Sequence, residues 1–254
     1  MKAHAKINLA LVVGPRRADG MHEVATVLQR IDLADDIALE AANKTEVEGY
    51  SEDTLVHEAL RAIGVTAKVR IEKRIPVAAG LGGGSSDAAT TLRLANETLE
   101  GPLGRQELHR LARELGADVP FFLGEGPQLG LGSGATLSEL VLPQDYLVML
   151  VLPRDAKKRS TKAVYDAFDG EDGFEDRLEA LLAALEAGDL GALPPNDLVS
   201  SPIADELRAA GAFRADVTGA GPAVYGLFTE RDRAAAAREL FTDRCETWLT
   251  APAW

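Results

Sequence analysis

The segment Pro76–Ala89 reads Pro-Val-Ala-Ala-Gly-Leu-Gly-Gly-Gly-Ser-Ser-Asp-Ala-Ala and decides which fold the chain adopts. It follows a predicted strand and opens a predicted helix whose first turn carries Ser85, Ser86 and Asp87. Four glycines within Gly80–Gly84 remove the Cβ atoms that would keep a ligand from the backbone, and they permit left-handed torsions. Successive N–H groups and the positive end of the helix then favour an anion. The segment therefore predicts a phosphate-binding loop.

The pattern of this loop differs from two common nucleotide motifs. A Walker loop needs lysine directly after its last glycine, and the dinucleotide fingerprint read from Gly80 needs glycine at the position of Ser85. Charge neutralisation is therefore expected from a metal and from cations elsewhere, such as Lys73. The hydroxyl of Ser85 or Ser86 can ligate Mg²⁺, which keeps water and phosphate oxygens as most of its shell. The alternative is a strand-to-helix turn in which Ser85 merely caps the helix.

Composition and charge exclude several classes of function. The 254 residues carry a formal net charge of −13, which argues against a nucleic-acid module and against attraction to anionic lipid. The single cysteine, Cys245, excludes an internal disulfide and a cysteine-based zinc site. The N-terminus lacks the apolar core of a signal peptide, and the longest apolar stretch, Tyr146–Leu152, is too short to cross a bilayer. We therefore expect a cytoplasmic protein that binds phosphates locally, without nucleic-acid or membrane partners.

Hydrophobic periodicity predicts an α+β protein, because strands and helices are interleaved without the regular strand–helix alternation of a doubly wound sheet. Expected strands lie near Ala5–Gly14, Ala67–Glu72, Tyr146–Leu152, Ala215–Thr218, Ala223–Phe228 and Glu246–Thr250. Expected helices contain the apolar stripes of residues 56–63, 88–99, 108–115, 178–185 and 233–241. Asp19-Gly20 predicts a hairpin-like bend after the first strand. The order of elements after Leu142 fits a ferredoxin-like unit, so we predict two domains, residues 1–142 and 143–254.

The phosphate loop resembles that of the GHMP kinases, a superfamily that includes galactokinase, homoserine kinase and mevalonate kinase. The triple-glycine form is similar to the branch that phosphorylates the 2-hydroxyl of a cytidine diphosphate-linked methylerythritol in non-mevalonate isoprenoid biosynthesis. Further similar segments are Ala5–Leu9 with Arg17–His22, then Gly116–Phe122, and finally Thr218–Pro222. The resemblance implies a ribosomal-S5-like ATP domain followed by a ferredoxin-like domain, with ATP and Mg²⁺ as cofactors. The implied nucleotide-binding residues are Lys73, Pro76, Gly80, Leu81, Gly82, Gly83, Gly84, Ser85 and Ser86, with Ser86 on the metal.

Asp118 and Lys6 form the candidate catalytic pair. Asp118 lies in a short, otherwise apolar segment, and a buried carboxylate there is costly without a partner or a role. By resemblance, Asp118 orients and deprotonates the acceptor hydroxyl while the γ-phosphoryl group is transferred. Lys6, a lone cation among apolar residues of the first strand, is its expected partner. The alternatives are a structural ion pair or an aspartate that caps the next turn.

The substrate side of the site is expected at Asn8, Met21, His22, Thr161 and Tyr165. By resemblance, His22 reads the edge of the cytosine ring and Tyr165 forms one aromatic wall. The family usually has an aromatic residue at the position of Met21, so stacking there is expected to be looser. Without the resemblance, a solvated turn histidine is favoured for His22, and Tyr165 can equally be a core aromatic.

Two other segments keep two interpretations. The run Lys157–Arg159 can meet a substrate diphosphate or the nucleotide phosphates, although a solvated loop is favoured. The glycines of Thr218–Pro222 can bring backbone N–H groups to substrate phosphates or simply form a tight turn between strands.

We expect a small-molecule kinase, monomeric or homodimeric. The rivals are a GHMP kinase of the homoserine or mevalonate type and a catalytically silent nucleotide-binding regulator.

Overall fold

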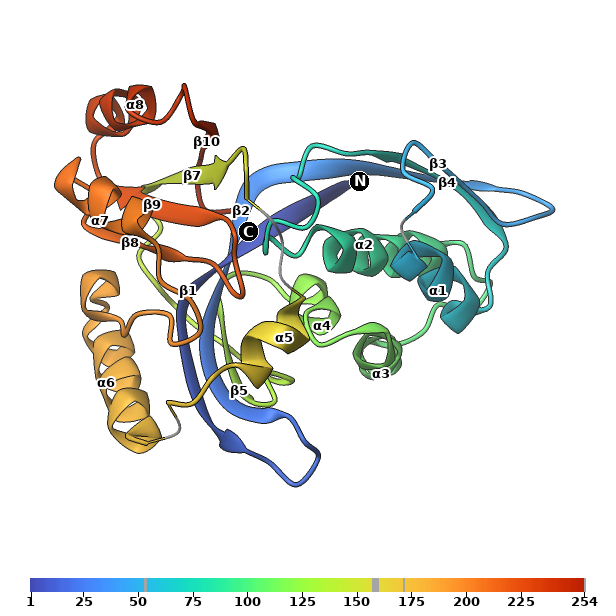
Figure 1. Cartoon of the computed structure of the whole chain (residues 1–254). Coiled ribbons are helices and arrows are strands. Elements are labelled where there is room, and N and C mark those ends of the chain that lie inside the picture. The colour runs from blue at the N-terminus through green and yellow to red at the C-terminus, as the bar shows by residue number, and fades with distance from the viewer. Residues whose placement is uncertain (53, 157–159, 171, 254) are drawn as a thin grey trace. The chain divides into compact units, whose positions relative to one another are not determined.

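The computed structural model describes residues 1–52, 54–156, 160–170 and 172–253 and divides into two compact units (Figure 1). The first unit comprises Met1–Ala5, Leu33–Val77 and Gly82–Glu125, and the second comprises Lys6–Asp32, Ala78–Leu81 and Gly126–Trp254. Strands β1 (Lys2–Arg16) and β2 (His22–Ala41), which pair with each other, contribute residues to both units. The domain division at residues 142 and 143 stays a prediction.

Among its described residues, the first unit combines strands with four helices. β4 (Ala67–Glu72) pairs antiparallel with β2 over residues 36–41 and parallel with β3 (Glu46–Glu48). The helices are α1 (Thr54–Ile63), α2 (Gly83–Glu97), α3 (Arg105–Leu115) and α4 (Val119–Leu123). α1 lies beside α2 and buries one apolar stripe at every third or fourth residue, as the 3.6-residue period requires (Figure 1). The stripe Val56, Ala59, Leu60 and Ile63 is the one that the sequence predicts.

The second unit contains a four-stranded antiparallel sheet in the order β10-β7-β9-β8. Its strands are β7 (Leu147–Pro153), β8 (Arg214–Val217), β9 (Val224–Phe228) and β10 (Cys245–Thr250). α7 (Pro202–Ala209) packs on β8 and β9, and α8 (Arg231–Glu239) packs on the same sheet (Figure 1). In the order of appearance along the chain, the strands lie 4-1-3-2 and two of the connections carry helices. This arrangement confirms the predicted ferredoxin-like unit.

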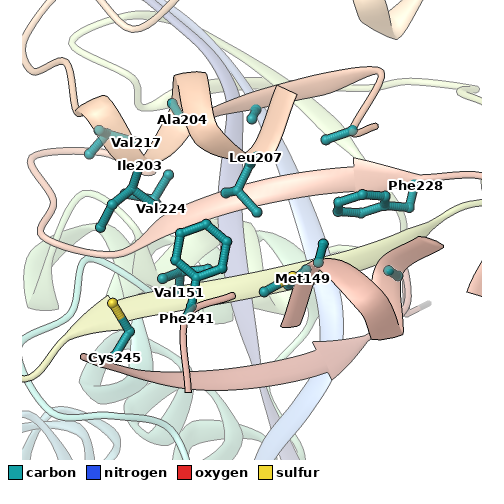
Figure 2. Close-up of a cluster of buried hydrophobic side chains, with 14 residues drawn as sticks. Met149, Val151, Ile203, Ala204, Leu207, Val217, Val224, Phe228, Phe241 and Cys245 are labelled. Carbon is teal, nitrogen blue, oxygen red and sulfur yellow. The ribbon is translucent and has the colours of Figure 1, made fainter. Parts of the chain in front are cut away.

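A buried apolar cluster holds α7 and α8 to this sheet. Met149 and Val151 of β7 meet Leu207 of α7 and Phe241, which follows α8 (Figure 2). The side chains of Leu207 and Phe241 are fully buried, and Cys245 belongs to the same cluster. Burial of side chains of this size stabilises the fold by roughly 1.5–3 kcal/mol each.

The remaining elements of the second unit lie outside the four-stranded sheet and its two packed helices. β5 (Gln128–Gly132) pairs with the first half of β2 and with β6 (Thr136–Glu139), both antiparallel. α5 (Thr161–Asp166), α6 (Phe174–Ala187) and the 3₁₀ turn η1 (Leu190–Ala192) connect β7 to α7. Across the described residues, no helix is both long and apolar enough to cross a membrane.

Candidate functional site

The second half of the phosphate loop, Gly82–Ser86, forms the start of α2. Its N-cap residue is Gly82, with φ +72°, so no side chain caps the helix from that position. The first helical hydrogen bond runs from the Ser86 N–H to the Gly82 carbonyl at 2.9 Å, and the amides of Gly83–Ser85 precede it. Ser85 lies inside the helix, so the alternative in which it serves as the cap is wrong. A helix start that lacks a side-chain cap suits an anionic ligand.

The first half of the loop lies against a second glycine loop, Thr218–Pro222. The Ala223 N–H donates to the Ala79 carbonyl at 3.1 Å. Gly80 has φ +86°, and a Cβ atom there would lie 2.8 Å from the Thr218 carbonyl oxygen and 2.9 Å from that of Gly221. Backbone therefore meets backbone at Gly80, at a distance that excludes any side chain.

Lys6 belongs to a buried polar network that we call the lysine network: Lys6, Asn8, Thr26 and Thr218. The Lys6 ammonium donates to the Asn8 side-chain oxygen at 2.7 Å, and the Asn8 amide nitrogen Nδ2 donates to Thr26 Oγ1 at 2.8 Å. The Asn8 backbone N–H donates to Thr218 Oγ1 at 3.0 Å. Lys6 is 5% exposed, and its own N–H donates to the Leu81 carbonyl at 2.9 Å.

This network adjoins the second glycine loop. A Cβ atom on Gly219 would stand 3.2 Å from the Asn8 side-chain oxygen and 3.7 Å from the Lys6 ammonium. Hydrogen bonds on both sides of its carboxamide fix Asn8, and Asn8 in turn holds the ammonium of Lys6. The predicted residues Lys6 and Asn8 are therefore neighbours in the structure.

Asp118 occupies the N-cap position of α4 and is half-buried. Its φ and ψ of −85° and −16° are helical rather than extended, and its carboxylate makes no capping hydrogen bond. The alternative of an aspartate that caps the turn is therefore wrong. Pro120 follows within the first helical turn, where its missing N–H costs nothing. The pairing of Asp118 with Lys6 stays a prediction, because the two residues belong to different units.

Lys73 sits between two fully buried carboxylates, and we call Lys73, Asp35 and Asp87 the Lys73 cluster. The Lys73 ammonium lies 2.7 Å from an oxygen of Asp35 and 2.7 Å from an oxygen of Asp87. Burial alone would lower the pKa of Lys73, but attraction to Asp87 and hydrogen bonds to both aspartates raise that pKa above its ordinary value. The ammonium also lies 5.7 Å from the centre of the Tyr50 ring.

His22 is buried among aromatic rings. Its Nδ1 donates to the Gly14 carbonyl at 2.8 Å, and its ring centre lies 5.8 Å from that of Tyr165 and 5.7 Å from that of Phe168. A carbonyl only accepts, so Nδ1 carries the proton and Nε2 of the neutral ring is an acceptor. Nε2 is buried without a hydrogen-bond partner among the described residues. His22 is 5% exposed, so the alternative of a solvated turn histidine is wrong.

The other substrate-side residues are more exposed. Met21 is 47% exposed, and Thr161 is the exposed first residue of α5. Tyr165 packs on the buried cluster of Leu11, Val13 and Val24 while it also faces His22. The run Lys157–Arg159 lies outside the described residues.

Sequence reasoning did not identify Asp35, assigned no role to Asp87 and missed Phe168. The signal for Asp35 was the acidic pair Asp35-Asp36 within an otherwise strand-forming stretch. No group of histidine, cysteine or acidic side chains in the described part of the chain has the geometry of a metal site.

Comparison with known proteins places these features in one family. The model of the GHMP kinases N terminal domain matches residues 50–126, and that of the GHMP kinases C terminal domain matches residues 177–247. A 4-diphosphocytidyl-2-C-methyl-D-erythritol kinase from Caldicellulosiruptor bescii is 36% identical, with 94% of this chain and 92% of the relative covered.

Solved structures agree with the sequence relatives. A crystal structure of 4-(cytidine 5'-diphospho)-2C-methyl-D-erythritol kinase is 32% identical, with a TM-score of 0.83 and 100% and 99% of the two chains covered. A mevalonate kinase structure has a TM-score of 0.72 at 14% identity and covers 99% and 98%, so it shares the fold alone. The two-domain α+β fold implied by the resemblance is therefore confirmed.

Proposed function

As a member of the 4-diphosphocytidyl-2-C-methyl-D-erythritol kinase family of GHMP kinases, the chain is an ATP-dependent small-molecule kinase, and we propose how its residues carry out the reaction. The substrate proposed is 4-diphosphocytidyl-2-C-methyl-D-erythritol, phosphorylated on its 2-hydroxyl to give the 2-phosphate and ADP. The observation that carries the proposal is the phosphate loop, which starts α2 at a left-handed glycine and offers amides that no side chain caps.

Lys6 and Asp118 are proposed as the catalytic pair. Asp118 accepts the proton of the acceptor hydroxyl, and the Lys6 ammonium steadies the charge that develops on the attacking oxygen. The fixed position of Lys6 supports this role, because the Asn8 carboxamide holds its ammonium at 2.7 Å. General-base assistance contributes about 10²–10⁴ in rate, and most of the remaining acceleration comes from positioning and charge neutralisation.

ATP is proposed to bind with its phosphates on the amides of Gly80–Ser85, because the Ser86 N–H already donates to the Gly82 carbonyl. Bound Mg²⁺ supplies charge neutralisation at the phosphates. Ser86 is the proposed protein ligand, and its place in the first turn of α2 supports this. A single hydroxyl fits the preference of Mg²⁺ for a shell made mostly of water and phosphate oxygens.

The nucleobase of the substrate is proposed to lie at His22 and Tyr165. The buried acceptor Nε2 of His22 fits the exocyclic amino group of cytosine, whereas the O4 oxygen of uracil would place two acceptors against each other. Tyr165 offers a ring face beside His22. Met21 is exposed and can lie against the base with its thioether, and Asn8 and Thr161 complete the proposed substrate contacts.

An ADP-release assay tests the substrate assignment. The purified enzyme, with ATP and Mg²⁺, is offered the cytidyl substrate, its uridyl analogue, homoserine and mevalonate. We expect turnover with the cytidyl substrate and competition by CMP. Turnover of homoserine or mevalonate alone would reassign the substrate. Normal ATP binding without turnover of any alcohol would support the silent nucleotide-binding regulator.

Two variants test the catalytic pair. Lys6→Ala and Asp118→Ala are each expected to abolish turnover while the fold and ATP affinity stay nearly unchanged, as measured by circular dichroism and nucleotide titration. Wild-type rates in either variant would remove that residue from the mechanism. The cytoplasmic setting and the monomeric or homodimeric state stay predictions.

A further inference from the structure

The Lys73 cluster does not carry the positive charge that a phosphate site needs. Two carboxylates and one ammonium sum to −1, and the side chains of both aspartates are fully buried. An ammonium has three N–H donors, and two of those of Lys73 already point at carboxylate oxygens at 2.7 Å. Lys73 is therefore already paired with two carboxylates and keeps one N–H donor, and its direct contact with a triphosphate stays a prediction. The tight hydrogen bonding of Lys73 points to a positional role.

The cluster acts on the segment that leads into the phosphate loop. The second carboxylate oxygen of Asp35, Oδ1, accepts from the Arg74 N–H at 2.5 Å and from the Ile75 N–H at 2.8 Å. Asp35 thus binds the side chain of Lys73 with one oxygen and the next two backbone amides with the other. Such charge-assisted bonds are roughly twice as strong as neutral ones.

The same segment packs directly against the loop. A Cβ atom on Gly83 would stand 3.2 Å from Ile75 Cγ2 and 3.4 Å from the Lys73 ammonium. Asp87 lies one turn further along α2 and holds the ammonium from the helix side. The aspartates of β2 and α2 therefore fix Lys73 and Ile75 against the residue whose amide begins the helix.

We propose that Asp35 and Asp87 are positioning residues for nucleotide binding, which act through Lys73 to hold Gly83 and the adjoining amides in the geometry that receives the phosphates. This inference rests on the proposed ATP site at the loop. It concerns the residues that hold Lys73 and Ile75, both of which pack against Gly83 of the loop.

Substitutions that keep the shape of the aspartates but remove their charge separate this role from an electrostatic one. Asp35→Asn and Asp87→Asn each remove one negative charge close to the proposed triphosphate site. If the cluster acted by charge alone, both variants would bind ATP more tightly, because a repulsive charge is gone. If the aspartates position the loop, both variants bind ATP more weakly. The two readings thus predict opposite signs for the change in KM for ATP.

Asp36→Asn is the matched control. Asp36 is the next residue on the same strand, but it pairs with Lys2 at 2.7 Å and with Arg74 at 3.0 Å, and it is partly exposed. Its substitution removes the same charge from the same strand without touching Lys73. We expect KM for ATP to rise at least tenfold in Asp35→Asn and Asp87→Asn and to change less than twofold in Asp36→Asn. The kcat at saturating ATP and the KM for the alcohol should stay within about twofold of wild type.

Lys73→Arg and Lys73→Met complete the experiment. Arginine keeps donors for both carboxylates and should restore much of the ATP affinity that methionine loses. If Asp35→Asn does not fold, the proposal is tested by titrating ATP directly into Asp87→Asn, Lys73→Arg and Lys73→Met and comparing their ATP affinities. A merely structural role would lower kcat through the active fraction and leave KM for ATP unchanged, and that result, or tighter ATP binding, would overturn the proposal. A wild-type enzyme that binds no ATP would instead refute the proposed function.

Discussion

Alanine at Gly80 should cost more stability than alanine at a glycine with the same backbone conformation in open space. At φ +86°, any residue with a Cβ atom is strained by about 1–2 kcal/mol. The added Cβ would also stand 2.8 Å and 2.9 Å from the carbonyl oxygens of Thr218 and Gly221, which are backbone atoms and cannot rotate away. Forcing such atoms apart typically costs a further 1–3 kcal/mol or so. We therefore expect Gly80→Ala to lower the free energy of unfolding by about 2–5 kcal/mol.

Gly64→Ala is the matched control for this prediction. Gly64 has φ +74°, and a Cβ atom there would meet nothing within 4 Å. The free energy of unfolding of the control should therefore fall only by the backbone strain, about 1–2 kcal/mol. The excess in Gly80→Ala, about 1–3 kcal/mol, corresponds to a melting temperature about 2–12 °C lower than that of the control.

Two measurements check the reasoning. Thermal and urea unfolding give the stability difference between the variants, and nucleotide titration gives the ATP affinity. Because the clash displaces the phosphate loop from the second glycine loop, ATP affinity should fall in Gly80→Ala and stay unchanged in Gly64→Ala. Equal melting temperatures for the two variants, or equal ATP affinities, would refute the claim that close backbone contact at Gly80 shapes the loop.

Three further predictions follow from single residues. Ala78 has φ +64°, so Ala78→Gly should relieve strain and raise the free energy of unfolding by up to about 1 kcal/mol, measured by urea unfolding; a loss of stability would contradict it. Burial raises the pKa of the Cys245 thiol, so the native protein should react with a thiol reagent at least about 100-fold more slowly than the unfolded protein; similar rates would contradict its burial. Burial also raises the pKa of Asp216. In the unfolded chain an aspartate loses its proton near its ordinary pKa of about 3.9, whereas the native state still holds the proton just above that pH. Relative to Asp216→Asn, wild-type stability should therefore fall as pH rises from about 3.9 through the raised pKa, and parallel urea curves over that range would contradict the shift.

Helices with one buried stripe were predictable from the sequence, whereas the longest strand was not. The stripe that ends at Ile63 and the glycine caps after α3 and α6 follow from local periodicity and local backbone chemistry. β2 shows no alternation, because consecutive residues of its first half are buried on both faces. Gln29 and Arg30 are buried within it and interrupt its apolar run. A strand covered on both sides gives no period-two signal.

The candidate site was predictable where its chemistry lies in a short segment. The phosphate loop is such a segment, because its glycines and the following helix start are contiguous. Asp35 was not predictable, because its partners, Lys73 and the amides of Arg74 and Ile75, lie 38 to 40 residues away. Phe168 was also missed, because its meaning depends on the ring of His22 brought beside it by folding.

Of the two interpretations of the second glycine loop, the tight turn between strands is confirmed. Thr218–Pro222 is a tight turn between β8 and β9, with the Thr218 N–H donating to the Ala223 carbonyl at 3.0 Å. Its shape is fixed from outside by Asn196, whose side-chain nitrogen donates to the carbonyls of Val217 and Gly219 at 2.9 Å and 2.7 Å.

Those bonds turn the Gly219 carbonyl toward Asn196, while the Cα of Gly219 faces Asn8 and Lys6. Thr218 meets Asn8 directly, so the turn that joins two strands also supports the lysine network. A turn built only to reverse the chain would tolerate side chains on its concave face. Here the carbonyl oxygens of Thr218 and Gly221 exclude a side chain at Gly80 of the phosphate loop, and the side-chain oxygen of Asn8 crowds one at Gly219. The backbone of the turn must therefore pass close to Lys6 without a side chain in between, while contact of its N–H groups with substrate phosphates stays a prediction.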